Sequence, residues 1–179
     1  MNIYLIGYRG TGKTTVAQFL AQRIRWRWVD ADVELEQRVG MTIADLFSKE
    51  GEQVFRDWET RVLADLAQQN QLIVATGGGV LLREENRQTI KGSGKTVWLK
   101  ATPETIYKRL HTDETTQSRR PNLTKDGGLR EIEKLLEQRT PIYRDCADWE
   151  IDTERSSPAA VADLIVVKLD EKLPRPEQT

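Results

Sequence analysis

The sequence predicts an α/β protein with a parallel β-sheet covered by helices on both faces. Five short runs of β-forming residues alternate with longer stretches of helical periodicity, as in βαβ units. Three of the five runs are almost entirely apolar, as expected for central strands buried on both faces. The 179 residues, 38% of them hydrophobic, are enough for one folded core. We therefore expect a single domain over residues 1–173 and a disordered, proline-containing tail over 174–179.

The expected strands are residues 2–6, 28–30, 72–75, 96–99 and 149–151. Apolar residues four positions apart predict amphipathic helices after Thr14 and after Gly51. The first stripe is Val16, Leu20 and Ile24, and the second is Val54, Trp58, Val62 and Leu66. Three hydroxyl residues are typical helix N-caps: Thr42 before an Asp at the third helical position, and Thr102 and Ser157 before prolines.

Composition argues against several functional classes. The 27 basic and 28 acidic residues give a net charge of −1, which provides no overall field for nucleic acid or an anionic membrane. A lone cysteine, Cys146, cannot form an internal disulfide, and a lone histidine, His111, cannot build a His-rich metal site. Neither a signal peptide nor a membrane-spanning apolar run is recognisable. We expect a cytoplasmic protein that binds neither membranes nor nucleic acid.

A phosphate-binding motif follows the first strand. Residues 7–14, GYRGTGKT, fit G-x-x-x-x-G-K-[ST] between an apolar strand and an amphipathic helix. Its glycines let backbone N–H groups surround phosphate oxygens, while the lysine reaches the β- and γ-phosphates and the hydroxyl ligates Mg²⁺. The N-K-x-D and D-x-x-G patterns of guanine-specific switches do not occur. We expect ATP binding by Gly10, Thr11, Gly12, Lys13, Thr14 and Thr15, with Lys13 catalytic and Thr14 a metal ligand.

Two carboxylates, Asp30 and Asp32, end the second strand. They are expected at the carboxyl edge of the sheet, where ligands bind in open α/β folds. One carboxylate could hold the Mg²⁺ water shell while the other takes a proton from a hydroxyl nucleophile. The alternative interpretation is that they cap the next helix.

Three glycines and two arginines suggest a pocket for an anion. Gly77, Gly78 and Gly79 follow the third strand at the same edge, and three consecutive glycines suggest close approach to a ligand. Arg56 and Arg139 belong to two different helical stretches. Each read singly is typical of a surface residue, but together with the glycines they favour a clamp for a carboxylate or phosphate.

The segment 111–128 breaks the alternating pattern. Its only large apolar residue is Leu123, so it cannot bury itself and must lie over the surface or move. A functionless insertion is one interpretation. The adjacent Arg119 and Arg120 favour the other, a lid that closes on an anion.

Taken together, these segments resemble the shikimate kinase family. The phosphate loop is shared with many families, whereas the patterns F-R-x-x-E, T-G-G-G and R-x-P-x-Y are much more specific. The similarity covers residues 2 to about 165 in order. It rests on the phosphate loop, VDAD at 29–32, MTIADLFSKEGEQVFRDWE at 41–59, TGGG at 76–79, RRPNL at 119–123 and RTPIY at 139–143.

The resemblance implies a three-layer P-loop kinase fold with a five-stranded parallel sheet of order 2-3-1-4-5 and a mobile lid. It implies transfer of the ATP γ-phosphoryl group to the 3-hydroxyl of shikimate in aromatic amino-acid biosynthesis, with Mg²⁺ as cofactor. Nothing apolar and repeated suggests an assembly, so we expect a monomer. The site residues that the resemblance implies are Asp32 as base and hydroxyl ligand, Arg56 and Arg139 on the shikimate carboxylate, Gly77, Gly78 and Gly79 lining the pocket, Asp30 at the Mg²⁺ shell, Arg120 as a catalytic contact to the phosphates, and Arg109 and Arg155 with ATP, near the adenine.

Two features depart from the family pattern. The loop 152–158, expected near the adenine, reads ERSS at 154–157 where arginine-rich versions occur, and Asn122 stands where a leucine is common. Two rival functions share the phosphate loop. One is another small-metabolite kinase of the same fold, such as a gluconate kinase, and the other is a nucleotide-dependent switch, for which the paired carboxylates and extra arginines would have no use.

Overall fold

The computed structural model describes residues 1–112 and 128–172. A five-stranded sheet forms its centre, with strand order β2-β3-β1-β4-β5 and every neighbouring pair parallel. The strands are β1 (Asn2–Ile6), β2 (Arg27–Asp30), β3 (Leu72–Ala75), β4 (Gly94–Lys100) and β5 (Trp149–Asp152). All five predicted strands are present and the predicted order is confirmed.

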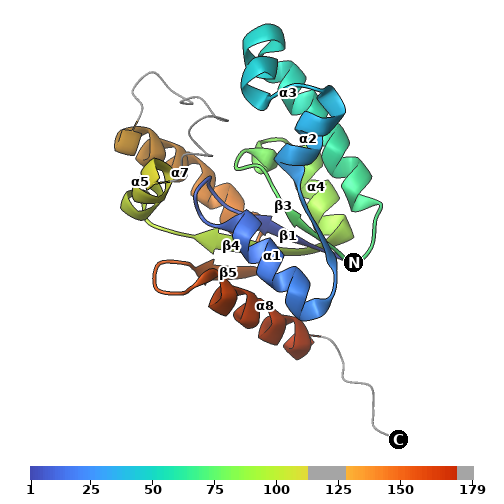
Figure 1. Cartoon of the computed structure of the whole chain (residues 1–179), viewed down its shortest axis with the longest axis vertical. Helices are drawn as coiled ribbons and strands as arrows, with labels where there is room; N and C mark the ends of the chain where they lie inside the picture. Colours follow the sequence, from blue (N-terminus) through green and yellow to red (C-terminus); the bar gives the residue numbers. More distant parts are fainter. Residues whose placement is uncertain (113–127, 173–179) are drawn as a thin grey trace, which may run out of the picture.

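Helices cover both faces of the sheet, because successive side chains of a strand point to opposite sides. On β1, Ile3 and Leu5 pack with α1 (Lys13–Ile24) and α8 (Pro158–Lys172). Tyr4 and Ile6 pack on the other face. Figure 1 shows helices on both sides of the sheet. The helices of that face are α2 (Ala31–Val39), α3 (Ile43–Ala67), α4 (Glu84–Ser93) and α7 (Gly128–Cys146). The predicted three-layer architecture is confirmed.

The predicted caps begin their helices. The Thr42 hydroxyl accepts a hydrogen bond from the Asp45 N–H at 3.1 Å, directly before α3. Pro103 and Pro158 are the first residues of α5 (Pro103–Thr112) and α8. The second predicted apolar stripe forms the part of α3 after Gly51, which has φ 85° and ψ 173° and kinks the helix. Gly51 therefore joins two predicted helical stretches at an angle.

The topology places the candidate site at one edge. The register pairs Leu5 with Ala75 and Asp30 with Ala75, so β1, β2 and β3 end side by side. The segments that leave these ends carry the phosphate loop, the two carboxylates and the glycine turn, which continues into the short helix η1 (Val80–Leu82). Ligands bind at such an edge in parallel α/β sheets.

Parts of the prediction lie outside the described residues. Of the expected lid at 111–128, only the ends are described, where α5 finishes at Thr112 and α7 starts at Gly128. Residues 113–127, with Arg119, Arg120 and Asn122, lie outside, as does the expected tail at 174–179. Within residues 1–112 and 128–172, no helix is long and apolar enough to cross a membrane.

Candidate active site

The phosphate loop turns sharply between β1 and α1. A Cβ atom on Gly7 would lie 2.4 Å from the Leu99 carbonyl oxygen on β4, so only glycine fits there. α1 starts at Lys13 without a side-chain cap and without an acidic residue in its own first turn, so its first N–H groups have no side-chain cap. The three glycines of the loop, Gly7, Gly10 and Gly12, have φ of 135°, 79° and 87°. The loop is thus shaped and charged to receive phosphate groups.

The Lys13 ammonium lies within the loop. Its Nζ atom donates to the carbonyl oxygens of Gly7 at 2.8 Å and Tyr8 at 2.9 Å. The Thr11 hydroxyl also donates to the Tyr8 carbonyl, at 2.8 Å. The two bonds of Lys13 hold its side chain beside the space that the loop surrounds. Thr14 and Thr15 are exposed on the first turn of α1.

Thr14 and Asp30 form the candidate Mg²⁺ position. The Thr14 hydroxyl donates to Asp30 Oδ2 at 2.7 Å. The other oxygen, Oδ1, caps α2 by accepting from the N–H groups of Asp32 at 3.0 Å and Val33 at 3.4 Å. The capping interpretation is therefore confirmed for Asp30. Because the cap uses only Oδ1, Asp30 can cap α2 and still present Oδ2, beside the Thr14 hydroxyl, to a metal ion.

The donor set of this position suits Mg²⁺ with a nucleotide. Among residues 1–112 and 128–172, no group of three or more His, Cys, Asp or Glu side chains could hold a metal ion by itself. Mg²⁺ typically keeps several waters and binds one or two protein ligands together with substrate phosphates. A hydroxyl and one carboxylate at the phosphate loop fit that pattern.

A cavity of about 480 Å³, the candidate acceptor cavity, opens between the phosphate loop, α3 and α7. All six residues that the sequence predicted for the substrate line it: Asp32, Arg56, Gly77, Gly78, Gly79 and Arg139. Asp32 and Arg139 are each only 8% exposed, so neither is a surface residue. Residues that were not predicted to bind the substrate complete the wall: Arg9, Ile43, Phe47, Glu52, Phe55, Glu59, Leu82, Leu135 and Gln138.

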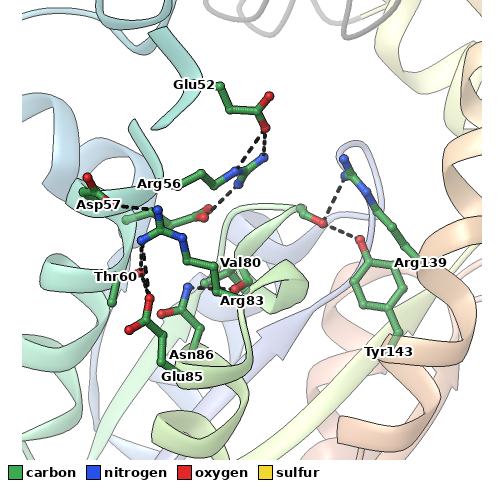
Figure 2. Close-up of polar contacts among 12 residues, drawn as sticks. Glu52, Arg56, Asp57, Thr60, Val80, Arg83, Glu85, Asn86, Arg139 and Tyr143 are labelled. Carbon is green, nitrogen blue, oxygen red and sulfur yellow. Dashed lines mark hydrogen bonds and ion pairs between the residues drawn. The ribbon is translucent and has the colours of Figure 1, made fainter. Parts of the chain in front are cut away.

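Two carboxylates on α3 hold Arg56 in place. Its Nη1 atom contacts Glu59 Oε2 at 2.8 Å. Its Nη2 atom contacts Glu52 Oε1 at 3.2 Å, as Figure 2 shows. Glu59 is 6% exposed, and its second oxygen, Oε1, has no hydrogen-bond partner within the described part of the chain. Burial raises the pKa of the Glu59 carboxyl above its usual value, although Arg56 acts in the opposite direction. Arg56 therefore compensates a buried charge as well as facing the cavity.

The glycine turn is needed because charged side chains approach its backbone. A Cβ on Gly77 would lie 2.8 Å from Asp32 Oδ1 and 2.9 Å from Glu59 Oε1. A Cβ on Gly79 would lie 2.7 Å from Arg56 Nη1. Side chains at these positions would displace the groups that line the cavity.

Of the two arginines predicted to lie near the adenine, Arg109 is held by hydrogen bonds and Arg155 is exposed. Arg109 on α5 donates from Nη1 to Thr153 Oγ1 at 3.0 Å and from Nη2 to the Thr153 carbonyl at 2.8 Å. It also reaches the Gly10 carbonyl at 3.4 Å, which links the phosphate loop to the loop 152–158. Arg155 is exposed on that loop. Glu154 accepts from the Thr102 N–H at 2.6 Å, and this bond lowers its pKa.

Arg9 lines the cavity but was not among the predicted site residues. Its Nη2 atom pairs with Glu131 Oε1 at 2.8 Å, and Glu131 is 1% exposed at the start of α7. The signal for Arg9 was a charged residue at a variable position of the phosphate loop. No local pattern marks Glu131, because its partner lies 122 positions away along the chain.

Comparison with known proteins decides the family. A family model described as shikimate kinase matches residues 9–170. The chain is 39% identical to the shikimate kinase of Burkholderia lata over 94% of this chain and 90% of that protein. It is 43% identical to that of Rhodopirellula baltica over 85% of this chain and 81% of that protein. The chain belongs to the shikimate kinase family.

Solved structures agree with this family assignment. The shikimate kinase from Acinetobacter baumannii, solved in complex with shikimate, superposes with a TM-score of 0.89 at 37% identity, covering 96% of this chain and 94% of that one. A gluconokinase from Sinorhizobium meliloti, with a TM-score of 0.52 and 14% identity, shares the fold alone. The predicted family and kinase activity are confirmed: the chain is an ATP-dependent kinase that phosphorylates shikimate, a step in aromatic amino-acid biosynthesis. The roles of individual residues stay predictions.

Proposed function

We propose that ATP binds along the phosphate loop, that shikimate binds in the acceptor cavity, and that the γ-phosphoryl group passes to the 3-hydroxyl, giving shikimate 3-phosphate and ADP. One observation carries this assignment. A cavity beside the phosphate loop is lined by two arginines from separate helices, a nearly buried carboxylate and a glycine turn. Shikimate carries a carboxylate and several ring hydroxyls, so it offers a matching group to each of these elements.

The arginines supply the charge complementarity. Arg56 on α3 and Arg139 on α7 lie on opposite sides of the glycine turn (Figure 2). Guanidinium groups bind carboxylates through charge-assisted hydrogen bonds, which are the stronger class of such bonds. Because the whole protein has a net charge of −1, attraction for an anionic acceptor must come from arginines gathered locally, and this pair together with Arg9 lines the cavity.

Asp32 supplies the acceptor for the reacting hydroxyl. Its carboxylate lies next to Gly77 in the cavity wall, on the segment that also carries Asp30 at the candidate metal position. A carboxylate there orients the hydroxyl and can take its proton as the phosphoryl group is transferred. Lys13 contacts the transferring phosphates from the other side, and Arg109 and Arg155 belong to the nucleotide side.

Thr14 and Asp30 would hold Mg²⁺. The ion, when bound, neutralises charge on the nucleotide phosphates. The protein itself contributes the hydroxyl of Thr14, which lies 2.7 Å from Asp30 Oδ2. It also contributes the carboxylate of Asp30, whose orientation is set because Oδ1 caps α2. We also propose that residues 1–173 act as one domain, that the enzyme is a monomer, and that it works in the cytoplasm, in line with a single, buried cysteine.

A coupled assay with ATP, Mg²⁺ and a panel of acceptors tests the proposal. We expect turnover with shikimate to exceed turnover with gluconate by orders of magnitude in kcat/KM, and nuclear magnetic resonance of the product to place phosphate on the 3-hydroxyl. Phosphate on another hydroxyl, or a preference for gluconate, would contradict the proposed assignment of the cavity.

Asp32→Asn tests the role of the carboxylate. The amide keeps the shape of the side chain but removes both a charged hydrogen-bond acceptor and a base, so kcat should fall far more than the free energy of unfolding. Steady-state kinetics and urea unfolding of the same preparation check this. Near-normal turnover would remove Asp32 from the reaction.

A further inference from the structure

The carbonyl group of Gly78 receives two hydrogen bonds from α7. Arg139 Nη1 donates to it at 3.2 Å and the Tyr143 hydroxyl donates to it at 2.5 Å. Figure 2 shows both side chains converging on this one oxygen from the same helix. Arg139 and Tyr143 are four residues apart, which places them on one face of α7. A carbonyl oxygen has two lone pairs, so these donors use its full capacity.

This arrangement fixes the orientation of one peptide group in the cavity wall. In a trans peptide the carbonyl and the following N–H point in opposite directions. With the Gly78 carbonyl held toward α7, the Gly79 N–H points away from that helix. Gly79 lies against the Arg56 guanidinium, since a Cβ there would lie 2.7 Å from Nη1. The Gly78–Gly79 peptide thus connects the two arginines of the clamp.

The surroundings of Tyr143 suit a fixed donor. The residue is 2% exposed, and its ring lies 5.7 Å from that of Trp98 on β4. Burial raises the pKa of Tyr143 to about 12, so its hydroxyl keeps its proton near neutral pH. The ring packs in the same apolar cluster as Val80 and Leu81, which follow the glycine turn directly.

We propose that Tyr143 is a positioning residue for the acceptor: its hydroxyl, together with Arg139, fixes the Gly78–Gly79 peptide so that Arg139 and the glycine turn meet shikimate in one geometry. This inference rests on the proposed function of the cavity. It assigns a task to the last residue of the R-x-P-x-Y pattern, which contributes nothing to the cavity lining itself.

Tyr143→Phe removes the hydroxyl and keeps the buried ring. The matched control is Tyr4→Phe: Tyr4 is 0% exposed on β1, its hydroxyl hydrogen-bonds Ser93 Oγ at 2.6 Å, and it does not line the cavity. We expect Tyr143→Phe to raise KM and the calorimetric Kd for shikimate five- to tenfold, about 1 to 1.4 kcal/mol. The Kd for ATP should stay within twofold, and melting temperatures should fall similarly in both variants.

The outcomes are separable. Tyr143→Phe with shikimate Kd within twofold of the parent would overturn the inference, as would equal weakening of ATP and shikimate or an equal effect in Tyr4→Phe. Loss of the folded state in Tyr143→Phe alone would also overturn it, because the hydroxyl would then support the fold. Arg56→Ala and Arg139→Ala enzymes that both keep the parent Kd for shikimate would refute the proposed assignment of the cavity instead.

Discussion

Arg139 and Arg56 face the same cavity, but they differ in what else they contact. Arg139 bonds the Gly78 carbonyl, whereas Arg56 pairs with the buried Glu59. We expect alanine at either position to weaken shikimate binding by about 1.5 to 3 kcal/mol, roughly 10- to 150-fold, with little change for ATP. Titration calorimetry with each ligand checks this. Equal loss of both ligands would mean that the arginine supports the fold and not the acceptor.

Glu59 makes the stability of Arg56→Ala depend on pH. Its raised folded-state pKa means that the native state binds the proton more readily than the unfolded state, so ionisation of Glu59 lowers stability as pH rises. Without Arg56 this penalty grows. The stability deficit of Arg56→Ala relative to the parent should therefore be larger near pH 8 than near pH 5 in urea unfolding. Arg61→Ala, an exposed arginine on the same helix, is the control, and a deficit independent of pH would contradict the argument.

At the scale of elements, a substitution in the glycine turn should affect substrate binding more than folding. The atoms that a Cβ on Gly77 would meet are the ends of the Asp32 and Glu59 side chains, which can shift without unfolding the protein. We expect Gly77→Ala to stay folded but to raise the KM for shikimate at least tenfold, because the displaced carboxylate no longer meets the hydroxyl.

Gly92→Ala is the matched control for this change. A Cβ on Gly92, which is exposed in α4, meets nothing within 4 Å. Alanine there should leave kinetics unchanged and stabilise the protein by at most about 0.5 to 1 kcal/mol, the range for glycine in a helix interior, because Gly92 lies in the last turn of α4. Kinetics and thermal melting of both variants provide the check. Parent-like kinetics in Gly77→Ala would show that the turn accommodates a Cβ atom without displacing Asp32.

At the scale of the whole molecule, Arg120 remains the predicted catalytic contact to the transferring phosphoryl group. A donor that acts chiefly in the transition state is worth about 2.7 to 4 kcal/mol, or roughly 10² to 10³ in rate. Arg120→Ala should lower kcat by that factor with little change in shikimate affinity or melting temperature, and Arg119→Ala should have a much smaller effect. Single-turnover measurements check this. If both variants behave alike, the catalytic arginine lies elsewhere.

The sequence by itself determined the features that depend on neighbouring residues. Strand runs, helix stripes, the caps at Thr42, Thr102 and Ser157, and the phosphate loop follow from local periodicity and local hydrogen bonding. The family-specific patterns predicted the sheet order and six of the residues that line the acceptor cavity. These predictions succeeded because each pattern occupies one short segment whose place in a parallel α/β sheet is set by topology.

Only the tertiary structure decided which side chains act on one another across the chain. The bond from Tyr143 to Gly78 spans 65 positions and the pair of Arg9 with Glu131 spans 122. The double use of Asp30, as cap and as partner of Thr14, likewise depends on how α1 and α2 lie at the sheet edge. Such contacts depend on the angle and depth at which helices pack. These are determined by the combined shape of many buried side chains, which no short segment specifies.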